Sequence, residues 1–306
     1  MLGDLYYGAL HNAGITMLAR RLRHGALVLC YHNVVSRSNG VRPFGDPGLH
    51  LPLDRFTDQI HYLRHHYTVV PLRELVTRLE AGGSLRGLAA ITFDDGYSGA
   101  TTFAWPLLRT LGLPATMFIV AEAPARPALF WWDHPAVAHE DTPSARNHLL
   151  ISLGGDRTII LKGTASAAPP APPDIPSTHL PADWSVIAKA AAEGLDLGAH
   201  TITHRTLTRL DDVDLEHEIR TPADIIQQYT GVRPALFSYP YGIWDRRVRD
   251  AVRRAGYRAA VTLDYGLNRA GIDVCGLRRI NVPASISPRA FGAWAAGMRP
   301  RRAPAA

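Results

Sequence analysis

Short apolar runs alternate with longer amphipathic runs along most of the chain. The strand-like runs are Ala26–Tyr31, Tyr67–Val70, Leu88–Phe93, Ala115–Val120, Leu195–Ala199, Ala235–Tyr239, Arg258–Leu263 and Leu277–Ile280. The runs with helical spacing are Leu53–His65, Leu72–Ala81, Ser98–Leu111, Pro181–Glu193, Asp212–Thr230, Trp244–Ala255 and Pro288–Met298. A glycine suited to a left-handed cap follows four of them, at Gly112, Gly194, Gly231 and Gly256. This alternation predicts an α/β fold in which helices wrap a parallel sheet.

One stretch, residues 122–180, interrupts the pattern. It contains many prolines and ends in Ala165–Pro176, which is almost entirely Ala and Pro. Prolines at this density oppose regular helix and central strand, so we expect an irregular insertion that ends in a mobile loop. Its aromatic segment Phe130–Asp133 has two equally weighted interpretations. The rings either anchor the insertion to the main domain or form a wall on which a sugar stacks.

Length and charge narrow the class of protein. A chain of 306 residues suits one large α/β barrel. The formal net charge is +6, but part of the excess lies in Arg20–Arg23 and Arg299–Arg302, and the rest is mixed with acids along helices. No nucleic-acid-binding motif is present, so we expect no nucleic-acid partner. The two cysteines, Cys30 and Cys275, have no CxxC spacing, and we expect no disulfide.

No apolar run approaches the roughly 18 residues that span a bilayer. The N-terminal stretch lacks the charge order of a secretion signal, which predicts a cytoplasmic or membrane-peripheral protein. Residues 4–23 have the spacing of a basic amphipathic helix, with Leu5, Leu10, Ile15, Leu18 and Leu22 on its apolar positions. Such a helix either packs on the domain or contacts a membrane peripherally.

Two adjacent carboxylates close the apolar run Leu88–Phe93. Asp94 and Asp95 are followed directly by Gly96. Active sites of parallel α/β folds lie at the carboxyl ends of strands. Neighbouring side chains on a strand point to opposite faces, so both acids converge only if the strand turns, which Gly96 permits. Two close carboxylates need a cation or a shared proton, although Asp-Asp-Gly alone is a common turn.

A histidine pair follows another strand-like run, Leu195–Ala199. His200 and His204 are four residues apart, so on a helical turn they would share one face. Two imidazoles with one carboxylate are a known catalytic zinc set that leaves a position for water. A histidine pair at this spacing is more often structural, but beside a strand-end Asp pair the metal-binding interpretation gains weight.

Two further strand ends carry candidate groups. In Tyr239-Pro240-Tyr241-Gly242, Pro240 has no N–H, so the next N–H, on Tyr241, can point into a site and hold an oxyanion. His32 follows Ala26–Tyr31 and is a candidate proton donor. Taken singly, the first motif is only a good turn and the second more often a capping or core histidine.

Taken in order, these segments resemble the polysaccharide deacetylases, the NodB-homology or carbohydrate esterase family 4 group. Thr92–Gly96 is similar to the family's Thr-Phe-Asp-Asp-Gly motif, His200–His204 to its His-Ser/Thr-x-x-His motif, and Tyr239–Gly242 to its Pro-Tyr-Gly region. The resemblance implies a distorted (β/α)7 barrel. It also implies a metal-dependent hydrolase that removes acetyl groups, chiefly N-acetyl, from an acetylated carbohydrate.

The resemblance also implies roles for single residues. Asp95, His200 and His204 would hold a divalent metal, commonly zinc, while Asp94 would act as general base. The Tyr241 N–H would hold the oxyanion, and Thr201 would steady the histidine loop.

Two departures from the family pattern stand out. The arginine that often precedes Pro-Tyr and holds the catalytic Asp is replaced by Ser238 and Tyr239, so that contact is absent or comes from elsewhere. The late Leu-x-His acid is also absent, since only His217, on a charged predicted helix, follows His204. The early Tyr31-His32 resembles the poly-N-acetylglucosamine deacetylase branch, which implies His32 as the acid.

Domain bounds follow from these patterns. We expect an N-terminal amphipathic helix over residues 1–24, a deacetylase domain over residues 25–298 with the insertion at 122–180, and a basic disordered tail over residues 299–306. Two alternative functions stay open. The protein could be a deacylase of a small N-acylated metabolite, favoured if residues 122–180 form a lid, or a non-catalytic carbohydrate-binding relative.

Overall fold

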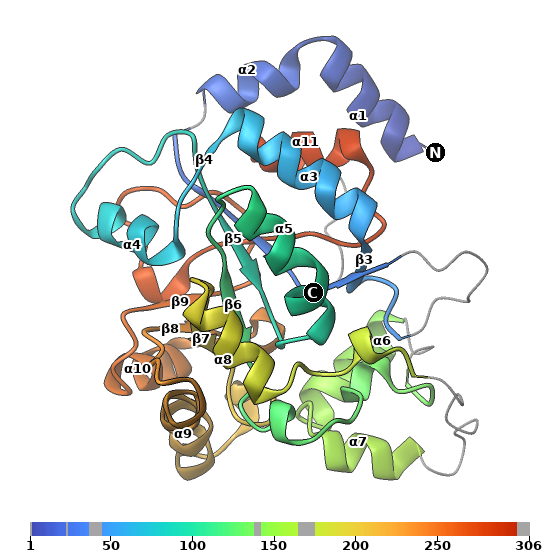
Figure 1. Cartoon of the computed structure of the whole chain (residues 1–306), viewed down its shortest axis with the longest axis vertical. Helices are drawn as coiled ribbons and strands as arrows, with labels where there is room; N and C mark the ends of the chain where they lie inside the picture. Colours follow the sequence, from blue (N-terminus) through green and yellow to red (C-terminus); the bar gives the residue numbers. More distant parts are fainter. Residues whose placement is uncertain (1, 23, 37–44, 138–141, 165–174, 299–306) are drawn as a thin grey trace.

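A computed structural model of the chain describes residues 2–22, 24–36, 45–137, 142–164 and 175–298 (Figure 1). Seven parallel strands of the described chain form one curled sheet, ordered β10-β1-β5-β6-β7-β8-β9. Their bounds are β1 (Leu27–Tyr31), β5 (Leu88–Phe93), β6 (Thr116–Ile119), β7 (Asp196–Ala199), β8 (Leu236–Ser238), β9 (Ala259–Val261) and β10 (Ile280–Asn281). The sheet is the distorted (β/α)7 barrel that the family resemblance implies, with short β4 (Thr68–Val69) added beside the start of β5.

The last strand segment closes the barrel. Leu277 forms a parallel bridge with Val261 of β9, and four residues later Asn281 of β10 pairs with Cys30 of β1. The segment 277–281 therefore lies between β9 and β1 and joins the two edges of the sheet. A separate two-stranded ladder, β2 (Asn33–Val35) with β3 (His50–Pro52), was not predicted, since runs of three residues carry too little periodicity.

Helices cover the outside of the sheet in the predicted order. They are α3 (Leu53–His66), α4 (Leu72–Glu80), α5 (Trp105–Thr110), α8 (Trp184–Ala192), α9 (Asp212–Thr230), α10 (Arg246–Arg254) and α11 (Pro288–Ala295). A π-helical turn, η1 (Ala100–Ala104), precedes α5 within the single helix predicted there. Gly231 ends α9 at φ 73°, in the left-handed conformation expected of it. The strands are apolar on both faces because helices cover one and side chains fill the other, as for Leu29, Ile91 and Phe237.

The N-terminal residues form two helices where one was predicted. They are α1 (Leu2–Asn12) and α2 (Ile15–Leu22), and the chain turns between them at Gly14, whose φ is 69°. α1 packs on α11, where the Trp294 Nε1–H donates to the Tyr7 hydroxyl over 3.0 Å. Over the described residues, every helix is too short or too polar to cross a membrane.

The insertion contains regular helices, so the prediction that its prolines exclude them was wrong. They are α6 (Pro143–Asn147) and α7 (Arg157–Thr164), with the short turns η2 (Ala123–Ala125), η3 (Trp131–Asp133), η4 (His148–Ser152) and η5 (Ser177–His179). Pro143 is tolerated because it occupies the first turn of α6, where its missing N–H has no helical partner. α7 contains no proline at all.

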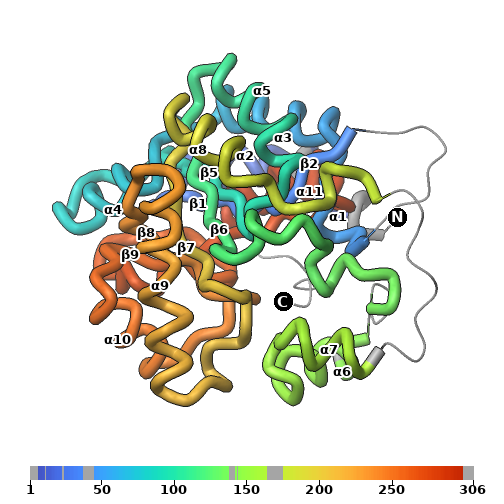
Figure 2. Tube along the Cα trace, turned by 60° about the horizontal axis from the view of Figure 1, so that its bottom comes forward, coloured from blue at the N-terminus to red at the C-terminus, as the bar shows by residue number. Residues whose placement is uncertain are grey.

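The insertion also has a small apolar cluster of its own, which includes Leu149, Leu150 and Ile160. α6 and α7 lie together at one end of the molecule, away from α2 (Figures 1 and 2). Most of Ala165–Pro176, expected to be a mobile loop, lies outside the described residues, as does the predicted tail 299–306.

Candidate active site

The two carboxylates at the end of β5 are separated by a sharp turn of the backbone. Asp95 has φ 71° and Gly96 has φ 86°, so the strand turns one residue earlier than the glycine alone suggested. The Gly96 N–H donates to the Asp94 carbonyl over 2.9 Å, which closes the turn. A non-glycine residue at positive φ is strained, and such strain is concentrated at functional sites. As a result, both acids lie inside the barrel mouth, each 3% exposed.

The histidine loop after β7 is not the helical turn that the spacing predicted. Thr201 has φ 67° and His204 has φ 63°, so the residues between the two histidines form an irregular loop. The Thr201 hydroxyl accepts the His204 N–H over 2.9 Å. The Glu218 carboxylate, from α9, accepts the N–H groups of Ile202 and Thr203 over 2.9 and 3.0 Å. These contacts hold the loop so that both imidazoles point towards Asp95, although the loop is not helical.

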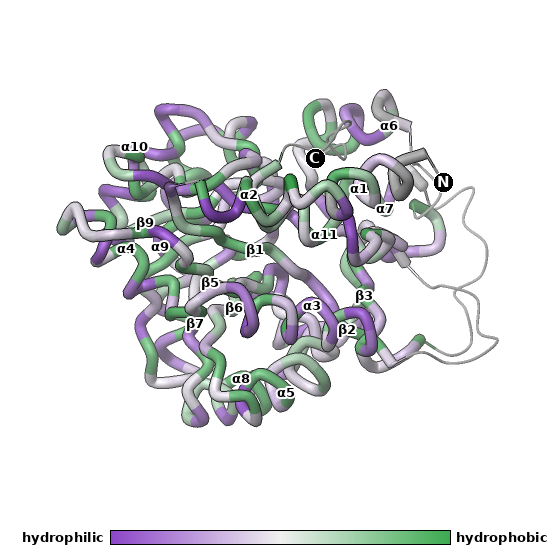
Figure 3. Tube along the Cα trace, turned by 90° about the horizontal axis from the view of Figure 1, so that it is seen from above, coloured by the Kyte–Doolittle hydropathy of each residue, from purple (hydrophilic) through white to green (hydrophobic). Residues whose placement is uncertain are grey.

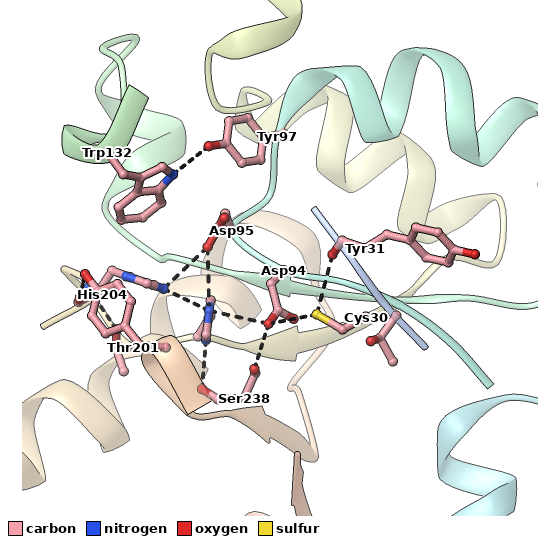
Figure 4. Close-up of polar contacts among 12 residues, drawn as sticks. Cys30, Tyr31, Asp94, Asp95, Tyr97, Trp132, Thr201, His204 and Ser238 are labelled. Atoms are coloured by element: carbon pink, nitrogen blue, oxygen red, sulfur yellow. Dashed lines mark hydrogen bonds and ion pairs between the residues drawn. The ribbon is translucent and has the colours of Figure 1, made fainter. Parts of the chain in front are cut away.

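Asp95, His200 and His204 converge on a single point (Figure 4). The Asp95 Oδ1 atom lies 3.4 Å from His204 Nε2 and 3.6 Å from His200 Nε2. The two Nε2 atoms are 3.0 Å apart. His200 Nδ1 lies 2.8 Å from the Ser238 carbonyl, which can only accept, so Nδ1 carries the proton and Nε2 presents a lone pair to the centre.

Electrostatics favours a cation at this point. Burial raises the pKa of Asp95 well above its usual range, and the negative charges of Asp94 and Asp133 raise it further. Burial also lowers the pKa of His200 and lowers that of His204 well below its usual value. Both imidazoles are therefore neutral at pH 7, the state in which histidine binds metal. A divalent cation would stabilise the buried carboxylate and use both lone pairs.

The donor set also fits a metal in its spacing. Zinc bonds of about 2.0–2.2 Å in a tetrahedral arrangement place ligand atoms roughly 3.3 Å apart. The three distances between the ligand atoms of Asp95, His200 and His204 are 3.0, 3.4 and 3.6 Å. A three-residue set of this kind leaves a position for water or substrate.

Asp94 is held by an arginine from the other end of the chain. Arg279 Nη1 and Nη2 lie 2.7 and 2.6 Å from Oδ1 and Oδ2 of Asp94, and both residues are buried. The Ser238 hydroxyl donates to Asp94 Oδ2 over 3.2 Å. Burial raises the pKa of Asp94, but Arg279, together with His200, outweighs it and keeps the pKa below its usual range. The arginine that was missing before Pro-Tyr is therefore supplied by Arg279.

Tyr241 occupies the turn after β8 at φ 58°. Its N–H donates to no acceptor within the described part of the chain, while the flanking N–H groups of Gly242 and Ile243 are both bonded. The ring lies edge-on to His204, 4.5 Å between centroids, and the hydroxyl donates to the His204 carbonyl over 2.9 Å. The turn is thus in contact with His204, and an N–H without an acceptor is available beside it.

His32 lies near Asp94, between β1 and β2. One of its ring nitrogens, the Cys30 sulfur and an Asp94 oxygen lie within 4.8 Å of one another. Burial lowers the pKa of His32 to about 4, so the imidazole is neutral at pH 7. Cys30 is a free, fully buried thiol whose pKa burial raises, which makes it a poor metal ligand. Cys275 is also free, as predicted.

The aromatic segment of the insertion packs directly on the site. The Trp132 ring lies 4.7 Å from that of His204, and its Nε1–H donates to the Tyr97 hydroxyl over 2.7 Å (Figure 4). Fully buried Asp133 accepts from the Tyr97 hydroxyl over 2.5 Å and lies 2.9 Å from His50 Nε2. The segment therefore anchors the insertion, as one interpretation predicted.

An open hollow of about 480 Å³, a volume that includes solvent, borders the same segment. Its lining includes Trp132, His204, Thr203 and Arg157. Trp132 thus contacts His204 and also borders open space.

Several residues of the site had not been predicted, namely Arg279, Glu218, Asp133 and Tyr97. Each acts through contacts between segments distant in sequence; Arg279 and Asp94 are 185 residues apart. The sequence offers one signal for such a residue, which is a charged residue directly beside an apolar, strand-like run. Arg279, directly before Ile280-Asn281-Val282, carries that signal.

Comparisons with known proteins assign the chain to a family. The model of the polysaccharide deacetylase family matches residues 83–260. The protein YxkH of Bacillus subtilis (strain 168), whose name assigns it to the polysaccharide deacetylases, is 20% identical over 274 residues, covering 89% of this chain and 76% of that protein.

Solved structures share the fold. The deacetylase PplD of Streptococcus pyogenes, in complex with acetate, superposes with a TM-score of 0.61 at 16% identity, over 87% of this chain and 96% of that one. IcaB from Ammonifex degensii gives a TM-score of 0.61 at 20% identity, over 90% and 98% of the two chains.

Proposed function

Because this chain belongs to the polysaccharide deacetylase family, we propose that it is a metal-dependent hydrolase that removes acetyl groups, chiefly N-acetyl, from a carbohydrate. One observation carries the proposal: the ligand atoms of Asp95, His200 and His204 lie 3.0–3.6 Å from one another, beside Asp94. We propose residues 25–298 as the catalytic domain.

Zinc is the metal that we propose, since two imidazoles and one carboxylate form a known catalytic zinc set. When bound, a divalent metal lowers the pKa of water towards roughly 7 and polarises the acetyl carbonyl. Asp95, His200 and His204 would hold it. The Ser238 carbonyl would fix the His200 ring through its Nδ1–H.

Asp94 would accept the proton of the attacking water. Its pKa, which Arg279 and His200 keep below the usual range, leaves the carboxylate ionised at pH 7, the form that can accept a proton. Arg279 would act as a positioning residue, because it occupies both oxygens from one side and fixes the orientation of the carboxylate.

The acetyl oxygen gains negative charge as water adds to the carbonyl carbon. The Tyr241 N–H would donate to this oxygen, a contact typically worth roughly 3 kcal/mol in the transition state. The C–N bond then breaks, and His32 would give a proton to the leaving nitrogen. Because the pKa of His32 is about 4, it would need to take up that proton during the reaction, and the carboxylate of Asp94, its neighbour, is the group from which it can come.

Acetate release from acetylated chito-oligomers tests the proposal. Wild-type protein should release acetate, a chelator should stop the release, and added Zn²⁺ should restore it. Asp94→Asn should abolish turnover while it still binds one metal ion. If Asp94→Asn releases acetate as fast as wild type, the assignment of the base is wrong. If zinc-loaded wild type releases no acetate from any acetylated sugar, the protein is a non-catalytic relative. The lack of an arginine before Pro-Tyr would have favoured this alternative, but Arg279 supplies the contact with Asp94.

A small N-acylated metabolite is a second candidate substrate, and one observation favours it. Trp132 covers His204, and the three metal-binding residues are only 2–5% exposed. Comparing kcat/KM for the N-acetylated monosaccharide and for its oligomers separates the two candidates. A value that rises with chain length supports a polymer, and a value that falls supports the metabolite.

A further inference from the structure

Exposed apolar side chains are concentrated on α2. Ile15, Met17, Leu18 and Leu22 are 42, 47, 53 and 64% exposed. Ile15, Leu18 and Leu22 have the spacing of one helical face, opposite Thr16, which is buried. Elsewhere in the described chain the large exposed apolar residues are scattered singly, so α2 carries an apolar stripe that nothing within the described chain covers.

Cations without acidic partners flank this stripe. Arg21 is exposed on α2 itself, and Arg86 lies beside it, donating to the Arg21 carbonyl over 2.6 Å. Arg20, at the edge of the same helix, contacts the Tyr62 hydroxyl over 3.2 Å. Among the ion pairs of the described residues, none involves these three arginines, whereas arginines on α9 and α10 are paired with Asp or Glu. The local charge is therefore uncompensated.

The helix is firmly attached to the domain. Arg20 joins it to Tyr62 of α3, Arg86 joins it to the turn before β5, and α1 packs on α11. An apolar stripe on a fixed helix, bordered by arginines without acidic partners, is complementary to a lipid surface. Anionic headgroups would pair with the arginines, and the acyl chains beneath them would contact the apolar side chains.

We propose that α2 docks the protein on an anionic lipid surface, with Leu18 and Leu22 entering the headgroup region and Arg20, Arg21 and Arg86 contacting lipid phosphates. Figure 3 shows α2 on the near surface, carrying both hydrophobic and hydrophilic segments. The insertion helices lie at the other end of the molecule (Figure 1). Docking through α2 therefore leaves the site free to receive a carbohydrate from the side away from the lipid.

Vesicle co-sedimentation of the full chain tests this proposal independently of catalysis. The protein should bind vesicles of phosphatidylcholine with about 30 mol % phosphatidylglycerol at least ~10-fold more strongly than pure phosphatidylcholine, since each cation near the surface contributes roughly fivefold. High salt should weaken the binding, because it screens the arginines. The double variant Leu18→Glu/Leu22→Glu should bind at least ~10-fold more weakly, since the two exposed apolar side chains that would enter the headgroup region are replaced by anions.

Val213→Glu is the matched control. Val213 is 79% exposed on α9, far from α2, so the same type of change should leave binding unaltered. Circular dichroism checks that all variants fold. Equal binding to both kinds of vesicle, or equal loss in the control, overturns the proposal. The proposal is also overturned if sedimentation velocity shows that wild type is a dimer and the α2 variant a monomer, because the stripe would then be an interface between copies.

Discussion

Arg279 and Asp94, 185 residues apart in the chain, form a two-pronged ion pair in the barrel interior. Neither residue is accessible to solvent to any useful extent: Arg279 is 0% and Asp94 3% exposed. A buried charge whose partner is removed costs several kcal/mol, and the effect is far larger than that of a surface pair. Replacing either residue should therefore lower both the stability of the protein and the activity that we propose.

We expect Arg279→Met to reduce kcat about 100-fold or more, because Asp94 loses the contacts that orient it. The acid limb of the pH profile should also move to higher pH. Arg279 now keeps the pKa of Asp94 below its usual range, and without it burial raises that pKa. A profile of kcat/KM against pH measures both effects.

Two further variants control this experiment. Arg279→Lys retains one charge and should recover part of the loss. Arg278→Met changes the exposed neighbour and should behave as wild type. An unchanged pH profile for Arg279→Met would contradict the positioning role.

Glu218→Gln should weaken metal binding by about 10–100-fold, the usual effect of disturbing the groups that support metal ligands. Glu218 Oε2 accepts two N–H groups of the loop between His200 and His204, and Oε1 accepts the Thr203 hydroxyl. An amide keeps only one of these two oxygens as an acceptor and lacks the negative charge. Competition against a zinc-binding dye gives the affinity. Glu216→Gln, on the same helix, removes only surface ion pairs with Arg220 and Arg254 and should bind metal normally. Equal affinities for the two variants would exclude a role of Glu218 in the loop.

In the metal-free protein, the three histidines of the site should contribute less to stability as the pH falls below about 6.5, while Asp95, whose pKa burial raises, contributes in the opposite direction. Burial lowers the pKa of His32 to about 4 and also lowers those of His200 and His204. Between the unfolded pKa and the folded pKa, the unfolded chain binds protons that the folded chain does not, so protons favour unfolding. Urea unfolding at pH 7.5 and 5, with a chelator, measures the difference. His32→Gln should show a smaller loss than wild type, and an equal loss would mean that His32 is protonated in the folded state.

Trp132→Ala should raise KM several-fold and change Tm little, because this half-buried ring borders the open hollow beside His204. Trp131→Ala should chiefly lower Tm, since that ring is 5% exposed and packs between the insertion and Tyr241, where loss of an aromatic side chain costs about 3–5 kcal/mol. KM from initial rates and Tm from thermal unfolding separate the two. A lower Tm with unchanged KM for Trp132→Ala would leave the segment with an anchoring role only.

Much of the fold could be predicted from the sequence, because its strands and helices are strongly patterned. β5 and α9 have the bounds that the apolar periodicity indicated. The sequence pattern did not predict very short elements such as β2 and β3. It also missed the proline-containing helix α6, which Thr142 caps and in which Pro143 occupies the first turn.

The candidate site could be predicted only in part, for a physical reason. Motifs next to strand ends identified the groups that converge, but not how the backbone brings them together. Thr201 and His204 at positive φ replace the helical turn that the spacing suggested, and no residue type announces such a conformation except glycine. Arg279 and His32 also lie outside the residues 83–260 that the family model matches.

The segment 277–281 has two effects at once, since it seals the barrel between β9 and β1 and delivers Arg279 to Asp94. During synthesis, Asp94 leaves the ribosome long before its counterion does. In a barrel that lacks this segment, Asp94 would be either exposed to water or buried in its protonated form, because burial disfavours an unpaired carboxylate. The ionised carboxylate that we propose as the base therefore depends on the same segment that seals the barrel.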